Sequence, residues 1–317
     1  MQQTILLPME EYLSARETAE IPPAQPHSAA WPGPWSRSAP ARHIRPVQAA
    51  PGRQADPATE DNHTVTTPAE SAVTVTFAGS GDAFGSGGRY QACIHLKALG
   101  QPGTVLLDCG ATSLSALKRF GLDPGEISIV LVSHLHGDHF GGLPFLILDG
   151  QFSRRVTPLT VVGPPGTTRR LTDTMECLFP GSSASPRRFS VNTAELSPGS
   201  TSNVHGVTVR AWQADHPSGA PSLLLRLHLA GKTIAYTGDT AWTDAISQAA
   251  ADADLLIAEA YYQDKNIPYH LRHADFDAHR DQLTAKRIIL THMSADMLGH
   301  QHETPFEPAR DGLVINL

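Results

Sequence analysis

The stretch His134-Leu135-His136-Gly137-Asp138-His139 decides how this chain of 317 residues is interpreted. It follows an apolar run, residues 127–132, whose composition predicts a buried strand. Two histidines separated by one residue project to the same side of an extended chain, and Gly137 permits a sharp turn after them. Asp138 and His139 then reach the same space from the far side of the turn. Imidazole and carboxylate groups at this density suit Zn²⁺, with Mn²⁺ or Fe²⁺ as alternatives.

Outward from this motif, hydrophobic periodicity predicts an alternation of strands and helices. Strands are expected over residues 73–77, 93–96, 104–108, 127–132, 159–162, 207–214, 222–229, 233–237, 255–259 and 287–291. Helices are expected over residues 113–120, 244–251 and 275–283. Consecutive strands come first and α/β alternation follows, which predicts two sheets packed face to face with helices outside.

The first 72 residues differ in composition from the rest. They hold 11 of the 25 prolines but only two of the 26 glycines. Proline-dense segments cannot continue a helix or a sheet ladder. The sequence therefore predicts a Pro-rich flexible N-terminal extension over 1–72 and one globular domain over 73–317.

Composition excludes several classes of protein. The 31 acidic against 24 basic residues give a net charge of −7, which argues against a wholly basic nucleic-acid binder. Three scattered cysteines exclude a disulfide framework and suit a reducing compartment, so a cytoplasmic location is expected. No apolar run reaches the ~18 residues of a membrane helix, so no membrane partner is expected.

The motif, placed after a buried strand, resembles the His-x-His-x-Asp-His hallmark of the metallo-β-lactamase superfamily. The resemblance implies a four-layer αββα sandwich and further ligands at later strand ends, where His216, Asp239 and His292 stand. It implies two divalent metal ions. The implied ligands of one metal are His134, His136 and His216, those of the other are Asp138, His139 and His292, and Asp239 bridges the two.

Two further segments resemble the ribonuclease Z branch of this superfamily. One is the Gly-rich opening Phe77-Ala78-Gly79-Ser80-Gly81-Asp82-Ala83, and the other is Ala258-Glu259-Ala260-Tyr261-Tyr262. In that branch the Glu partners a histidine on a following loop, and the pair helps to protonate the leaving oxygen. Glu259 would fill the first role, and His270 or His273 the second. Only 22 residues separate His216 from Asp239, so the transfer-RNA-binding arm of that branch cannot fit there.

The sequence therefore predicts a dinuclear-metal-dependent phosphodiesterase in which a metal-bridging hydroxide attacks phosphorus. The predicted catalytic residues are Asp138, His270 and Glu259. A lactone or thioester hydrolase with the same metal site is the first alternative, and a non-catalytic metal-binding carrier is the second. The Asp at position 239, where common class B β-lactamases have Cys, argues against a lactam substrate.

The predicted substrate is a small-molecule or nucleotide phosphodiester, and RNA is an alternative. Because many proteins of this superfamily form dimers, a homodimer is also expected. Three arginine pairs lie in residues 150–190, interpreted as a loop that could attract phosphate-bearing substrates. They are Arg154-Arg155, Arg169-Arg170 and Arg187-Arg188.

Overall fold

The computed structural model describes residues 72–317, which form two seven-stranded sheets. The Pro-rich extension predicted over 1–72 lies outside the described residues, except for Ala72. The strand order of the first sheet is β14 (Leu313–Asn316), β1 (Val73–Gly79), β2 (Cys93–Ala98), β3 (Thr104–Leu107), β4 (Ile127–Leu131), β5 (Leu159–Gly163) and β6 (Val191–Glu195). Pairing is antiparallel from β14 to β3 and parallel from β3 to β6.

The second sheet repeats this division into an antiparallel and a parallel half. Its strand order is β13 (Glu307–Pro308), β12 (Ile288–Thr291), β11 (Leu255–Glu259), β10 (Lys232–Tyr236), β9 (Leu223–Leu229), β8 (Val207–Gln213) and β7 (Thr201–Val204). Pairing is antiparallel from β7 to β10 and parallel from β10 to β13. Parallel neighbours need long crossover connections, and these connections supply the outer helices.

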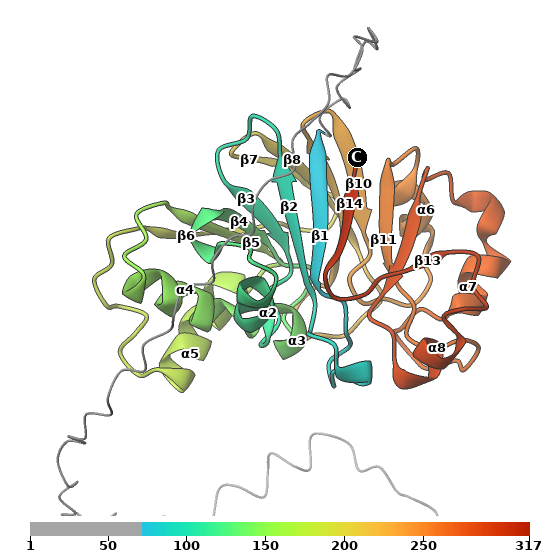
Figure 1. Cartoon of the computed structure of the whole chain (residues 1–317), viewed down its shortest axis with the longest axis horizontal. Helices are drawn as coiled ribbons and strands as arrows, with labels where there is room; N and C mark the ends of the chain where they lie inside the picture. The colour runs from blue at the N-terminus through green and yellow to red at the C-terminus, as the bar shows by residue number, and fades with distance from the viewer. Residues whose placement is uncertain (1–71) are drawn as a thin grey trace, which may run out of the picture. The chain divides into compact units, whose positions relative to one another are not determined.

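Helices cover the outer face of each sheet. Those that follow strands of the first sheet are α2 (Ser113–Arg119), α3 (Gly137–Phe140), α4 (Leu143–Phe152) and α5 (Thr167–Leu178), and those of the second are α6 (Asp244–Ala250), α7 (His273–Ala278) and α8 (Ala295–His300). Single 3₁₀ turns are η1 (Ser86–Gly88), η2 (Pro124–Glu126) and η3 (Arg280–Gln282). Figure 1 shows the helices in two groups on either side of the paired sheets.

Three apolar layers hold these elements together. The middle layer fills the space between the sheets with residues such as Phe77 and Leu107 from the first and Leu227 and Ile257 from the second. One outer layer packs α2, α4 and α5 on the first sheet, and the other packs α6, α7 and α8 on the second. Alternate strand residues point to opposite faces, so each sheet contributes to two layers. The predicted four-layer αββα sandwich is confirmed.

Two local predictions were wrong. The segment 150–190, interpreted as a loop, contains α5, because Leu171 and Met175 lie one turn apart and both are buried against the first sheet. The helix predicted over 275–283 is shorter. It is α7 followed by η3, and between Phe276 and Leu283 no large apolar side chain is available to bury a longer helix face.

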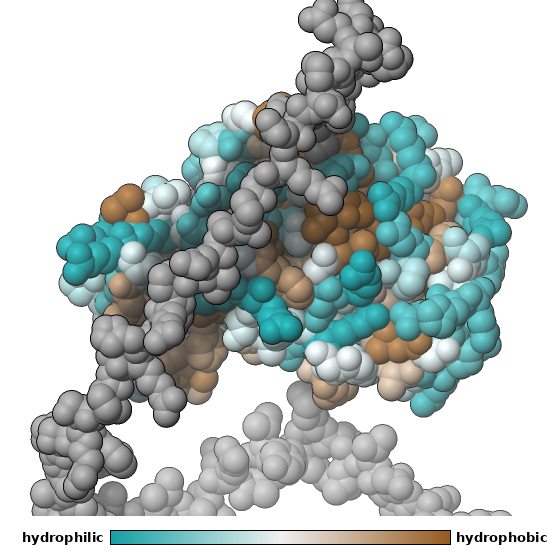
Figure 2. Space-filling model, viewed as in Figure 1, coloured by the Kyte–Doolittle hydropathy of each residue, from teal (hydrophilic) through white to brown (hydrophobic). Residues whose placement is uncertain are grey.

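No helix among residues 72–317 has the length and apolar character needed to cross a membrane. On the face shown in Figure 2, hydrophilic residues surround a hydrophobic patch over β1 and β14 in the middle of the view. β14 is an edge strand, and Val314 on it is 53% exposed.

Candidate metal centre

The loops that follow four strands meet at one edge of the two sheets. The six-residue motif follows β4, with Asp138 and His139 in α3, which lies at the lower edge of the sheets in Figure 1. His216 follows β8, Asp239 follows β10 and His292 follows β12. All seven residues predicted to bind metal are thereby brought together in adjoining groups.

The first group consists of His134, His136 and His216, whose ligand atoms lie within 4.8 Å of one another. Nε2 of His216 is 3.0 Å from Nδ1 of His136. Nδ1 of His216 donates to the carbonyl of Tyr269 at 3.0 Å, which leaves a lone pair on its Nε2. Nε2 of His134 is buried and has no hydrogen-bond partner within residues 72–317. Three imidazole nitrogens therefore face a common point.

The second group consists of Asp138, His139, Asp239 and His292. Nε2 of His139 is 3.2 Å from Nε2 of His292 and 3.3 Å from Oδ2 of Asp138. Nδ1 of His139 lies 2.6 Å from Oδ2 of Asp108, which orients the ring so that Nε2 points into the group.

Asp239 stands between the two groups and presents one oxygen to each. Its Oδ1 is 3.2 Å from Nε2 of His139 and 3.6 Å from Nε2 of His292. Its Oδ2 is 3.9 Å from Nε2 of His134 and 4.0 Å from Nε2 of His216. This is the arrangement expected of a bridging carboxylate.

The donor set fits cations better than it fits a hydrogen-bonded cluster. Facing imidazole nitrogens repel each other unless a proton or a cation lies between them, and this occurs twice, at 3.0 and 3.2 Å. Buried polar atoms normally have partners, yet Nε2 of His134 and Oδ1 of Asp239 have no hydrogen bond among the described residues. The two groups therefore fit a dinuclear metal site.

Charge in the second group also favours cations. Burial lowers the pKa of His139, but the carboxylates of Asp239, Asp138 and Asp108 outweigh it and raise that pKa well above its usual value. In His134, which faces fewer carboxylates, burial lowers the pKa well below its usual value. A site that holds a proton so strongly on a buried imidazole is negative in potential and attracts cations in general.

Glu259 and His270 form a pair beside the metal groups. Glu259 is the last residue of β11 and is buried, and its Oε1 lies 2.5 Å from Nδ1 of His270. Its Oε2 accepts the N–H of Thr240 at 2.9 Å, which fixes the carboxylate. Nδ1 of His270 is also 4.0 Å from Oδ2 of Asp239. Burial lowers the pKa of His270, but the hydrogen bond and charge of Glu259 raise it above its usual value.

His273, the other residue predicted as a proton donor, lies elsewhere. Its Nε2 is 2.8 Å from Oγ1 of Thr304, its Nδ1 is 3.3 Å from Asp277, and its ring packs near Phe306. It is buried in the helical layer and contributes nothing to the wall of the metal cavity. The geometry therefore favours His270.

The Gly-rich loop after β1 forms one rim of the site. Oδ1 of Asp82 accepts the N–H of Ser86 at 2.8 Å, and Gln91 donates to the carbonyl of Ala83 at 2.9 Å. Gly79 is required here, because a Cβ at this position would meet the carbonyl oxygen of Gln91 at 1.9 Å. Phe84 projects from this braced loop with 85% of its surface exposed.

A cavity of about 250 Å³ opens onto the metal groups, and five of their seven residues line it. Its walls are Ala83, Phe84, His136, Asp138, His216, Asp239, Tyr261, Ile267, His270 and His292. One side of it is therefore a cluster of imidazole and carboxylate groups, and the rim is aromatic and apolar. This combination can position a phosphate or carbonyl group next to an apolar or aromatic substituent.

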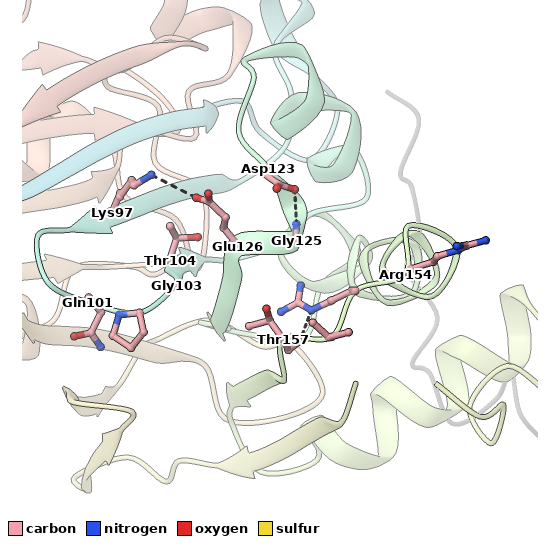
Figure 3. A pocket seen from close by; sticks show the side chains of 12 residues that line it. Lys97, Gln101, Gly103, Thr104, Asp123, Gly125, Glu126, Arg154 and Thr157 are labelled. Carbon is pink, nitrogen blue, oxygen red and sulfur yellow. Dashed lines mark hydrogen bonds and ion pairs between the residues drawn. The ribbon is translucent and has the colours of Figure 1, made fainter. Parts of the chain in front are cut away.

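A larger cavity, of about 660 Å³, lies at the starts of β3, β4 and β5, whereas the metal groups lie at the ends of the strands. Figure 3 shows Lys97 paired with Glu126, at 3.4 Å, and the carboxylate of Asp123 bonded to the N–H of Gly125. None of the predicted site residues lines it.

Sequence reasoning missed Asp108 and Phe84. Asp108 ends the apolar segment Thr104–Leu107, is fully buried and has φ 58°. A charged residue at the end of an apolar strand is the signal that could have found it. Phe84 carried no comparable signal, because its exposure depends on how the loop folds.

Residues 103–293 match the family model of the beta-lactamase superfamily domain. The chain is 25% identical over 273 residues to ribonuclease Z of Methanosarcina acetivorans, covering 70% of this chain and 87% of that protein. It is 27% identical over 292 residues to ribonuclease Z of Bacillus thuringiensis (strain Al Hakam), covering 74% and 93%. The solved structure of human tRNase Z, short form, superposes with a TM-score of 0.63 at 27% identity, covering 77% of this chain and 98% of that one.

Proposed function

This chain belongs to the beta-lactamase superfamily, and we propose that it is a metal-dependent phosphodiesterase of the ribonuclease Z type. The family match spans the motif at 134–139 together with His216, Asp239 and His292. Both curated relatives are named ribonuclease Z and the human structure is named tRNase Z, and each is covered over most of its length.

One observation carries the proposal. Asp239 offers one oxygen to each group of histidines, and the same residue lies 4.0 Å from the His270 ring that Glu259 holds. A carboxylate shared by two metal sites places both cations beside the reacting ester, and a nearby imidazole can protonate a poor leaving group.

When bound, two divalent cations, proposed here as Zn²⁺, supply Lewis acidity and lower the pKa of water toward neutrality. The proposed ligands of the first are His134, His136 and His216, those of the second are Asp138, His139 and His292, and Asp239 is shared. The neutral tautomers needed for binding are set by the partners of the other ring nitrogens, Tyr269 for His216 and Asp108 for His139.

His270 is the proposed general acid. Glu259 keeps Nδ1 of this ring hydrogen-bonded and stabilises its protonated form, so that Nε2 carries the other proton. His270 lines the cavity that contains the ligands, which supports transfer of this proton to the leaving oxygen of a bound phosphodiester. Asp138 is proposed to act through its place in the second metal group.

A small-molecule or nucleotide phosphodiester is the proposed substrate class, with RNA as the alternative. The connection between His216 and Asp239 runs through β9 and β10 alone, with no room for a transfer-RNA-binding arm. The cytoplasmic location and the homodimer remain predictions.

The proposal is tested on purified full-length protein whose metal content has been measured. We compare hydrolysis of bis(p-nitrophenyl) phosphate with that of a lactone and a thioester, in the wild type, Asp138→Ala and the control Asp281→Asn. Asp281 is exposed and lies outside the metal cavity.

We expect phosphodiester turnover that Asp138→Ala abolishes and Asp281→Asn preserves. Turnover of the lactone or thioester alone would replace the proposal with a carbonyl hydrolase. Two bound metals without turnover of any substrate would favour the non-catalytic metal-binding carrier protein.

A further inference from the structure

The three arginine pairs between residues 154 and 188 have different surroundings. Arg155 is buried, and its guanidinium donates to the carbonyls of Pro124, Thr157 and Pro158. Arg187 donates to the carbonyls of Ser182 and Ser183. In each of these two pairs, one guanidinium is therefore already hydrogen-bonded to nearby backbone carbonyls.

Arg169 and Arg170, both in α5, together line a cavity of about 320 Å³. The rest of its wall is Leu135, Pro165, Gly166, Asp173, Gly219 and Ala220. This cavity shares no residue with the one that contains the metal groups.

The two cavities nevertheless adjoin, because the same loops build both. Leu135 stands between the two histidines of the motif, and its Cα is ~3.8 Å along the chain from each of theirs. Gly219 follows His216 by three residues. A Cβ on Gly219 would lie 3.5 Å from Nη2 of Arg170, so this guanidinium rests against the loop that carries His216.

The guanidinium groups in this cavity are available to a ligand. No side-chain hydrogen bond or ion pair of Arg170 occurs within residues 72–317, and the side chain is exposed. Arg169 lies 3.5 Å from Asp173, with side chains 89% and 63% exposed. Such an exposed pair is weak, and water or an anion readily replaces it. Two guanidinium groups against one carboxylate leave the lining positive.

Resting on the proposed function, we propose that Arg169 and Arg170 bind a second phosphate group of the substrate, next to the phosphodiester that is hydrolysed. Guanidinium groups bind phosphate oxygens with paired hydrogen bonds, which explains why two of them serve one small cavity. A phosphate beside the reacting one exists in a nucleic acid strand and not in an isolated diester. The preferred substrate is therefore an oligonucleotide.

Binding and hydrolysis are measured separately. The binding probe is a fluorescein-labelled oligoribonucleotide of about ten nucleotides with phosphorothioate linkages, which resist hydrolysis, followed by fluorescence anisotropy at several NaCl concentrations. The hydrolysis probe is bis(p-nitrophenyl) phosphate, which carries a single phosphate. Both use full-length, metal-loaded protein. The variants are Arg169→Ala, Arg170→Ala and Arg170→Glu, with Arg188→Ala as the matched control because it is exposed and outside both cavities.

We expect each alanine variant to raise the Kd for the oligonucleotide about tenfold at low salt, and Arg170→Glu to raise it further. The slope of log Kd against log salt should decrease by about one for each arginine removed. Arg188→Ala should match the wild type, and kcat/KM for bis(p-nitrophenyl) phosphate should stay unchanged in all variants.

An unchanged Kd in Arg169→Ala and Arg170→Ala overturns the second-phosphate site, and so does an equal loss in Arg188→Ala. Both results leave the proposed function standing if bis(p-nitrophenyl) phosphate is hydrolysed. Arginine-dependent binding without any phosphodiester turnover would instead support the site and reject the proposed function.

Discussion

Oδ2 of Asp108 lies 2.6 Å from Nδ1 of His139, and both residues are fully buried. The same carboxylate accepts the hydroxyl of Tyr236 at 2.7 Å and the N–H and hydroxyl of Ser133 at 2.7 and 2.8 Å. Burial and Asp108 raise the pKa of Tyr236 well above its usual value, so its hydroxyl remains a donor. Asp108, which follows β3, therefore orients His139, which lies in α3 after β4, on the side of the ring that faces away from the second group.

Replacing Asp108 should weaken metal binding, although Asp108 is not itself a proposed metal ligand. The negative charge of Asp108 orients His139 and raises the basicity of its ring, and Asp108→Asn removes that charge. Partners of metal-binding histidines typically contribute 10- to 100-fold in affinity, and we expect a loss of about that size. Competition with a chelator, monitored by metal analysis, gives the affinity. Asp281→Asn is the control, and an unchanged affinity in Asp108→Asn would disprove the positioning role.

The role of His270 should depend on the leaving group. With a ribose hydroxyl as leaving group, His270→Ala should lower kcat by roughly 10²- to 10⁴-fold, because an alkoxide must be protonated as it departs. With p-nitrophenolate, which departs without a proton, the loss should be small. Glu259→Gln should show the same pattern. His302→Ala, an exposed histidine, serves as control. Equal losses on both substrates would remove the general-acid role.

Phe84 should contribute to substrate binding rather than to stability. Its ring is 85% exposed at the rim of the metal cavity, so Phe84→Ala leaves no buried void. Stacking of a base on an aromatic ring contributes about 1 to 3 kcal/mol, which corresponds to a rise in KM of roughly 5- to 150-fold. Phe84→Trp should retain binding. Phe152→Ala, with a ring 82% exposed outside this cavity, is the matched control. If both alanine variants have the same KM, Phe84 does not contact the substrate.

His95 should make the fold sensitive to acid. It is buried in β2, and burial together with Lys97 lowers its pKa from 6.5 to about 4. Above pH 6.5 the imidazole of His95 is neutral in both the folded and the unfolded chain. Between pH 6.5 and 4 only the unfolded chain takes up the proton, so the free energy of unfolding decreases as the pH falls, by about 2 kcal/mol at pH 5.

Urea denaturation at pH 7 and pH 5 measures this effect. His95→Gln, which cannot titrate, should lose less stability on acidification than the wild type. Acid also protonates the metal centre, but that loss is common to both proteins and cancels in the comparison. His302→Gln should behave as the wild type does. An equal loss in His95→Gln would show that His95 is not the acid-sensitive group.

The sequence by itself determined the two-sheet fold and the set of predicted metal-binding residues. The fold depends on local pattern, with apolar strands followed by an alternation of helices and strands. The set of metal-binding residues was implied by the resemblance of the motif at 134–139 to the metallo-β-lactamase hallmark, with His216, Asp239 and His292 at later strand ends. The motif follows β4 of the first sheet, whereas His216, Asp239 and His292 follow strands of the second. Packing the two sheets face to face brings these strand ends to one edge. The structure accordingly brings all seven residues together.

Tertiary structure alone decided which neighbours those residues have. His270 and His273 are three positions apart, yet one reaches the metal groups and the other packs near Thr304 and Phe306. Likewise, of six arginines in three similar pairs, only Arg169 and Arg170 line the cavity beside the motif. Such differences arise because contacts between residues distant in sequence depend on how strands pair and loops close, and the local pattern of residues does not contain that information.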